Sequence, residues 1–132
     1  MRVFLLLTMI FCHILDDYRL QGILSSMKQR SWWKENYPNE LYKHDYIAAL
    51  ITHSFSWTFM VQLPVMALII HNGFFNAVTP FLLVFLANML IHATIDHLKA
   101  NLQTINLITD QSIHLIQILI TWVIFVYVMP VI

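Results

Sequence analysis

Long apolar stretches alternate with shorter polar ones along the chain, and four of the apolar stretches are long enough to cross a membrane. A membrane-spanning helix needs about 20 consecutive, mostly apolar residues. The four predicted helices cover approximately residues 2–23, 46–70, 75–98 and 108–129. The later helices are joined by short connections, which favour antiparallel neighbours. The pattern therefore predicts an all-α integral membrane protein, an up-down four-helix transmembrane bundle that forms one domain over residues 1–132.

One polar segment, residues 25–43, interrupts this pattern between the first and second predicted helices. It combines tryptophan and tyrosine rings with lysine and arginine side chains. This mixture suits the headgroup layer of a bilayer, so we expect the segment to lie along the membrane surface. Its tryptophans, Trp32 and Trp33, are also suited to line a substrate entrance.

The basic residues indicate how the bundle is oriented. In the up-down arrangement Arg2 lies on one side of the membrane, and the other six lie opposite it: Arg19, Lys28, Arg30, Lys34, Lys43 and Lys99. Because cytoplasmic loops carry an excess of lysine and arginine, the crowded side is predicted to face the cytoplasm, with both termini outside.

Composition agrees with a lipid environment. The chain is 59% hydrophobic and 11% charged, whereas soluble domains carry about 25% charged residues. The formal net charge is zero and no basic stripe is present, so nucleic acid is not an expected partner. The expected partner is the bilayer itself, and a homo-oligomer stays open.

Histidines and aspartates occur in these apolar helices at a repeated spacing. An aspartate at the centre of a membrane helix costs about 2.5–3.5 kcal/mol on insertion, so such residues usually have a function. Positions four apart share one face of a helix. Three pairs have this spacing, and a lone histidine lies on the second helix: His13 and Asp17, His92 and Asp96, Asp110 and His114, and His53.

All seven of these side chains fall near the cytoplasmic ends of their predicted helices. In an up-down bundle they would meet at one depth, and imidazole with carboxylate predicts Zn²⁺ first, with Mn²⁺ or Fe²⁺ as alternatives. Seven ligands exceed the four of one tetrahedral zinc, which leaves two alternatives. Either some of the seven side chains contact the metal ligands and not the metal, or two ions are bound. Two divalent ions, three aspartates and a bridging hydroxide would sum to zero charge.

Other polar side chains extend the same helix faces. Gln21 continues the face of Asp17, and Asn88 continues that of His92. Such amides are suited to hold metal-binding imidazoles in place. Lys99 is also counted among the residues around the ligands. It could pair with an anionic substrate, but we expect its side chain to extend to the membrane surface.

Three of these motifs resemble those of a known family. Residues 13–21 match an H-x3-D-[FY]-x-L-Q pattern, residues 92–99 match H-x3-D-x2-K and residues 110–114 match D-Q-x2-H. With His53, they resemble the bacterial and phage membrane family catalogued as domain of unknown function 3307, over nearly the whole chain. The pattern is also similar to that of membrane-bound metal-dependent hydrolases. The resemblance implies a bacterial inner-membrane protein and adds Gln111 to the residues around the site, while Asp16 and His97 depart from the family's usual residues.

Together these observations predict a metal-dependent hydrolase with a mono- or dinuclear site at the cytoplasmic membrane surface. A metal ion would activate water and polarise a phosphoryl or carbonyl group, and Asp17 or Asp110 would act as general base. An amphiphilic or lipid-linked substrate suits a site at this depth. The alternatives are an ion or proton channel or transporter subunit, a phage accessory protein with a purely structural metal, and a metal-free polar network.

Overall fold

The computed structural model describes residues 1–131, and this part of the chain is helical, without β-strands. Its α-helices are α1 (Arg2–Leu15), α2 (Leu24–Met27), α3 (Arg30–Asn36), α4 (Asp45–Asn72), α5 (Val78–His97) and α6 (Leu107–Val123). Three helices continue as π-helix, at Asp16–Leu20, Leu98–Leu102 and Ile124–Val128. Short 3-10 helices cover Glu40–Tyr42 and Phe75–Ala77. The prediction of an all-α chain is confirmed.

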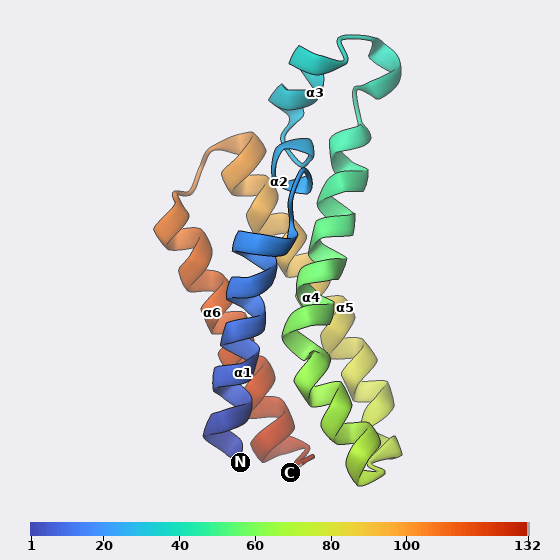
Figure 1. The fold of residues 1–132 in the computed structure, drawn as a ribbon, viewed down its shortest axis with the longest axis vertical. Coiled ribbons are helices and arrows are strands. Elements are labelled where there is room, and N and C mark those ends of the chain that lie inside the picture. The colour runs from blue at the N-terminus through green and yellow to red at the C-terminus, as the bar shows by residue number, and fades with distance from the viewer. Residues whose placement is uncertain (132) are drawn as a thin grey trace.

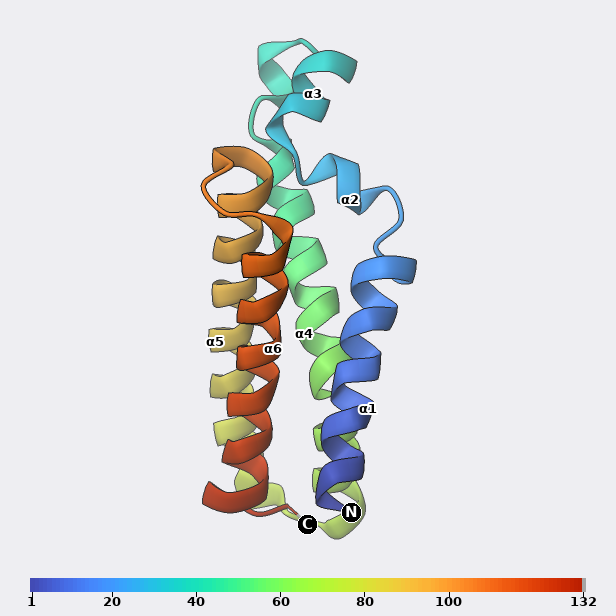
Figure 2. The same ribbon diagram turned by 90° about the vertical axis from the view of Figure 1, so that its left-hand side faces the viewer.

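The four longest helices, α1, α4, α5 and α6, lie along the molecule in alternating directions (Figure 1). Helix α4 packs against α1 and α5, and α6 packs against the same two helices, so the four close a ring. Both chain termini lie at one end of this ring, which we call the termini end (Figure 2). At the opposite end, called the site end, α1 and α5 finish and α4 and α6 begin.

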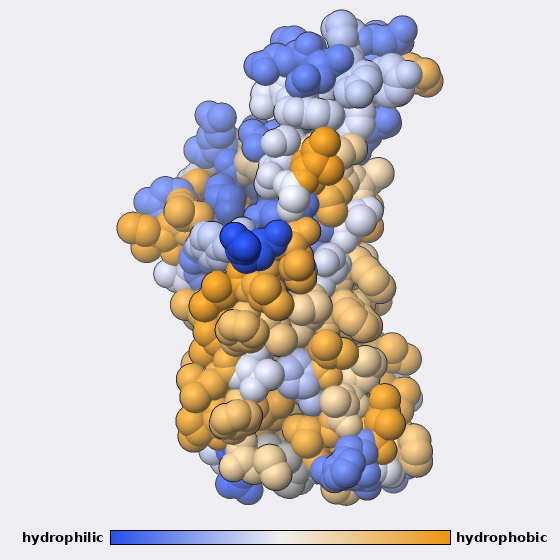
Figure 3. All heavy atoms as spheres, viewed as in Figure 1, coloured by the Kyte–Doolittle hydropathy of each residue, from blue (hydrophilic) through white to orange (hydrophobic). Residues whose placement is uncertain are grey.

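Three helical stretches are long and apolar enough to cross a membrane: Glu40–Asn72, Phe75–Leu102 and Leu107–Val128. They carry large apolar side chains on their outward faces, such as Phe55, Leu83 and Ile116. In Figure 3 apolar surface covers much of the bundle, and hydrophilic surface gathers toward the site end, with small patches at the termini end. So much exposed apolar surface is compatible with a location in lipid.

The first predicted span, residues 2–23, is not among these three stretches. Its helix runs through α1 and the following π-helix to Leu20, but Asp16, Asp17 and Arg19 occupy its last turns. Its outward face is nevertheless apolar, with Val3, Phe4, Leu7 and Phe11 exposed. The other three predicted spans match observed helices to within a few residues, and a fourth span stays a prediction.

The polar segment predicted at residues 25–43 is more structured than a surface loop. Helix α3 and the 3-10 turn extend beyond the site end, where the rings of Trp33, Tyr37 and Tyr42 pack on one another (Figure 1). Helix α2 packs against α4. As a result Lys28, which the sequence places on the membrane surface, is only 6% exposed.

The bundle interior changes character along its length. Toward the termini end it is filled by apolar side chains, among them Leu5, Met9, Val61, Val65, Ile69, Phe81, Ile118 and Phe125. Trp57 is the last large member of this core toward the site end. Beyond it, histidines and aspartates from all four helical segments are buried together, beside Tyr46, Ala49, Leu50 and Ser54 of α4.

Candidate metal centre

A π-helical turn brings two neighbouring carboxylates of the first long helix into the interior. Asp16 and Asp17 begin the π-helix after α1, and they are 0% and 8% exposed. Both reach α4: Asp16 accepts a hydrogen bond from Ser56 at 2.7 Å, and Asp17 Oδ1 lies 3.4 Å from His53 Nε2. Single π-turns are rare and are frequently found at functional sites.

Asp17, His53 and His92 form one group of candidate ligands. The two histidines come from α4 and α5, are fully buried, and have their Nε2 atoms 3.2 Å apart. With a carboxylate oxygen of Asp17 they offer three ligand atoms that lie within 4.8 Å of one another. Imidazole and carboxylate groups at such distances can bind one divalent metal ion.

His92, Asp96 and His114 form a second group with the same property. Asp96 lies one turn beyond His92 on α5, with Oδ1 3.6 Å from His114 Nε2 and Oδ2 3.3 Å from His53 Nε2. Because His92 belongs to both groups, five side chains from the four long helical segments surround a single small volume.

The orientation of the His114 ring is fixed by a neighbouring amide. His114 Nδ1 lies 3.1 Å from Gln117 Oε1, and the amide nitrogen of Gln117 donates to Asn88. Nδ1 therefore carries the hydrogen, and a neutral ring has its lone pair on Nε2. That Nε2 has no hydrogen-bond partner among residues 1–131 and lies 3.6 and 3.5 Å from carboxylate oxygens of Asp96 and Asp110. A lone pair facing carboxylates requires a cation between them, either a metal ion or a proton.

Two lysines enter the cluster and pair with its carboxylates. Lys28 Nζ lies 2.6 Å from Asp96 Oδ2, and Lys99 Nζ lies 2.5 Å from Asp110 Oδ2. The expectation that Lys99 extends to the membrane surface is therefore wrong. Asp110 is fully buried, and an unpaired charge in a low-dielectric interior costs more than the lysine would gain by reaching water.

These contacts change the charge balance expected from the sequence. The buried carboxylates number four, namely Asp16, Asp17, Asp96 and Asp110. Two of them are neutralised by Lys28 and Lys99. With neutral imidazoles the cluster keeps two negative charges, which one divalent cation would balance.

His13 and Asp110, both predicted as ligands, lie beside the two groups and not within them. Asp110 is 3.5 Å from His114 Nε2. His13 Nδ1 accepts a hydrogen bond from Trp57 Nε1 at 2.8 Å, so only its Nε2 is available to a metal. The Trp57 ring also stacks on His92, with centroids 4.2 Å apart, and thus holds two of the predicted ligands in place.

The residues predicted to surround the ligands do so to different degrees. Gln111 donates to carboxylate oxygens of both Asp17 and Asp110, at 3.2 and 2.9 Å. Gln21 donates to the backbone oxygen of Asp17. Asn88 lies one hydrogen bond further from the ligands.

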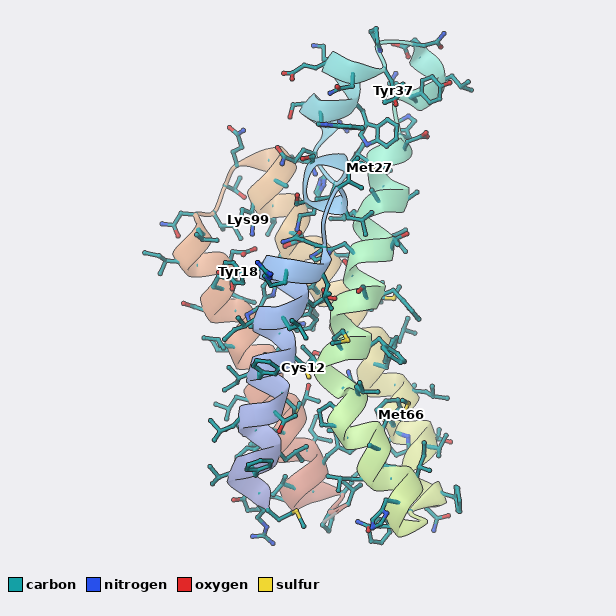
Figure 4. The ribbon with its side chains drawn as sticks, viewed as in Figure 1. Cys12, Tyr18, Met27, Tyr37, Met66 and Lys99 are labelled. Atoms are coloured by element: carbon teal, nitrogen blue, oxygen red, sulfur yellow. The ribbon has the colours of Figure 1, made fainter. Side chains whose placement is uncertain are left out.

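The cluster meets the molecular surface at a small pocket of about 70 Å³ at the site end. Its lining includes Asp17, Gln111 and both lysines of the cluster. In Figure 4, Lys99 and Tyr18 mark this level of the bundle, nearer the site end than Cys12. The pocket is the route by which water or a small group could approach Asp17.

Three residues of the site were missed in the sequence: Asp16, Lys28 and Trp57. Trp57 follows His53 by four positions and shares its helix face, so the spacing that identified the other pairs could have found it. Asp16 depends on the π-turn, and Lys28 depends on how α2 packs, neither of which appears in the periodicity. The surplus of aspartates over basic residues in the predicted spans was the signal that buried cations were needed.

Neither the models of known protein families, nor curated proteins, nor solved structures give a match to this chain.

Proposed function

We propose that this protein is an integral membrane metal-dependent hydrolase, with four spanning helices and one divalent ion near the cytoplasmic face. The observation that carries the proposal is the position of His92, whose ring belongs to two groups of ligand atoms drawn from the surrounding helices. Intramembrane ionisable residues are rare and are usually functional, so their meeting at one level supports a built site.

The ion we propose is Zn²⁺, Mn²⁺ or Fe²⁺, held by His92 together with Asp17, His53, Asp96 and His114. The charge count supports one ion, since a second would leave the buried cluster positively charged. The hydrogen bond from His114 Nδ1 to Gln117 is the arrangement common to metal-bound histidines, because it directs Nε2 to the ion and raises its basicity.

A hydrolytic role is supported by the pocket at the site end, which brings water to one carboxylate of the cluster. An ion here would supply an activated water and polarise the scissile group. Asp17 lines the pocket, whereas Asp110 is fully buried and paired with Lys99. Asp17 is therefore the better placed general base, since it can accept a proton from water in the pocket.

The site end is proposed to face the cytoplasm of a bacterial inner membrane. Helix α1 would be the fourth span, which its exposed apolar face supports. The basic residues other than Arg2 lie at or beyond the site end, as the positive-inside rule requires. The depth of the metal site, near the lipid headgroups, would suit an amphiphilic or lipid-linked substrate.

Metal content tests the proposal directly. Protein purified in detergent and reconstituted with Zn²⁺, Mn²⁺ or Fe²⁺ should hold about one ion per chain by elemental analysis. His92→Ala should lose the ion and still insert into membranes. His71 is an exposed histidine at the far end of α4, and His71→Ala should keep the ion. A protein that stays metal-free with all three ions would overturn the proposal.

Hydrolysis requires a separate measurement on the metal-loaded protein. Chromogenic phosphate and carboxylate esters should be hydrolysed at a rate that falls with Asp17→Asn and with His92→Ala. Stoichiometric metal without hydrolysis of either ester class would contradict the enzyme and favour a structural metal.

A second candidate, an ion or proton pathway, is favoured by a hydrogen-bonded chain below the site. From His114 it continues through Gln117 and Asn88 to Thr121, toward the middle of the bundle. Beyond Thr121 the interior is largely apolar, with Val65, Phe81 and Phe125. Gln62 is the buried polar exception that the structure describes at this depth, and this weighs against a continuous path. Proton or metal flux in proteoliposomes that disappears with Asp110→Asn would reverse our ranking.

A further inference from the structure

The pocket at the site end is lined by groups that suit one kind of ligand. Its walls come from the π-turn after α1, the end of α2, the π-turn after α5 and the start of α6, and they consist of Asp17, Tyr18, Gln21, Lys28, Lys99, Leu107 and Gln111. The lining thus combines two lysines and two glutamines with Asp17, one of the candidate ligands. Tyr18 and Leu107 are more than half exposed and form an apolar rim.

The two lysines each connect this pocket with the cluster. Lys28 Nζ contacts Asp96, and Lys99 Nζ contacts Asp110, while both side chains line the pocket. Gln111 lies between them, with its amide nitrogen on Asp17 and Asp110. An anion that entered the pocket would meet both lysines, and Gln111 could turn one N–H from a carboxylate to the anion, without any change in the helices.

We propose that this pocket binds the phosphoryl group of a phosphate ester, which is the substrate class of the hydrolase proposed above and rests on that proposal. A water needs about 10–15 Å³ of such space, so about 70 Å³ accommodates a group the size of several waters. A phosphoryl group fits this limit, whereas the remainder of the ester must stay outside, against the rim of Tyr18 and Leu107. Lysine ammoniums are common phosphate ligands, and three donor side chains match three non-bridging oxygens.

The reaction is hydrolysis and needs water alone as co-substrate. The oxygen of a water molecule forms a bond to phosphorus, and the bond from phosphorus to the ester oxygen breaks with its electron pair on that oxygen. The water proton passes to the Asp17 carboxylate and then to the released oxygen, which leaves as an alcohol. Inorganic phosphate, or a phosphate monoester from a diester, is the other product.

The competing explanation is that the lysines serve only as counter-ions of Asp96 and Asp110. The two explanations differ in what happens when a lysine is removed. A counter-ion alone affects metal affinity, which should rise when a positive charge is lost near the ion. If the lysines also form an anion site, removing one of them weakens the binding of phosphate as well.

The test uses Mn²⁺-loaded protein in detergent, with inorganic phosphate as the probe and its ³¹P line width as the readout. A paramagnetic ion close to the pocket should broaden the phosphate signal. Lys99→Gln should bind Mn²⁺ and require at least tenfold more protein for the same broadening. Lys28→Arg, which keeps the positive charge, should broaden the phosphate signal as the unaltered protein does. Lys43→Gln, a matched lysine outside this pocket, should behave as the unaltered protein.

Measured metal content separates the two proposals. Failure to bind Mn²⁺ would overturn the proposed function, whereas bound Mn²⁺ with no phosphate broadening, or with equal broadening in Lys99→Gln, would overturn only the phosphate pocket. Two substrate arms then identify the source of the phosphoryl group. Release of phosphate from a water-soluble ester alone indicates a soluble substrate. Release of phosphate from phosphatidic acid, or of a phosphate monoester from a diester phospholipid, in nanodiscs indicates a lipid headgroup.

Discussion

The two halves of the bundle are built from the same four helices and are buried to a similar degree, but they are filled by different side chains. In the half toward the termini, Val65, Ile118 and Phe125 are at most 1% exposed. In the half toward the site end, His53, His92 and Asp110 are also fully buried. The boundary is Trp57, which packs with the apolar core and stacks on His92.

This difference separates two sources of stability. Apolar side chains pack by dispersion, which depends on how well their shapes fit and needs no bound ion. Buried charges lose their hydration, and they are stable only when each has a partner of opposite charge. The termini half can therefore act as a fixed scaffold, while the site half depends on its lysines and, under our proposal, on a metal ion.

The largest expected effect comes from removing a counter-ion in the site half. Lys28→Met leaves the buried Asp96 carboxylate without its 2.6 Å partner, and breaking a buried pair costs about 3–5 kcal/mol. We expect the metal-free variant to lose about that much free energy of unfolding in detergent. Adding Zn²⁺ should stabilise the Lys28→Met variant by more than it stabilises the unaltered protein. An equal loss with and without Zn²⁺ would show that Lys28 has no effect on ion binding, which would contradict an ion beside Asp96.

Metal addition should stabilise the site half selectively. A ligand at 100 times its dissociation constant stabilises the folded state by about 2.7 kcal/mol. Thermal unfolding of the unaltered protein should therefore shift upward with Zn²⁺ and return with a chelator, and His92→Ala should show no shift. Ile118→Val, in the termini half, should shift by the same amount as the unaltered protein. A shift that persists in His92→Ala would place the ion elsewhere.

The boundary between the halves can be tested at Trp57. Trp57→Phe keeps a ring against His92 but removes the N–H that His13 accepts at 2.8 Å. A buried acceptor without its donor costs about 1–3 kcal/mol, so the free energy of unfolding should fall by that amount. If His13 is outside the ligand groups, the affinity for Zn²⁺ should change little. A clear fall in affinity on titration with Zn²⁺ would show that His13 binds the ion.

The contrast between the halves also explains what the sequence could predict. The pairing of His92 with Asp96, or of Asp110 with His114, follows from helical spacing, and their meeting follows from short connections between antiparallel helices. Lys28 could not be placed in this way, because its burial depends on a long-range contact between α2 and α4. The exact ligand groups depend on π-turns and side-chain rotamers, which a periodic pattern does not specify.

The smallest expected effect lies in the termini half, at a polar residue that its surroundings do not satisfy. Gln62 is 1% exposed, and neither atom of its amide has a hydrogen-bond partner within residues 1–131. Replacing an unsatisfied buried polar group by an apolar one of similar size is often stabilising, so Gln62→Leu should raise the free energy of unfolding by about 1 kcal/mol. Gln117→Leu is the matched change in the site half.

We expect Gln117→Leu to lower stability and metal affinity together, because Gln117 holds the His114 ring. Opposite signs for the same substitution, measured by denaturation in one detergent, would confirm that the two halves follow different rules. If Gln62→Leu instead destabilised the protein and also reduced proton flux in proteoliposomes, Gln62 would belong to a polar path through the termini half. The termini half would then be part of an ion or proton pathway and not a scaffold for the site.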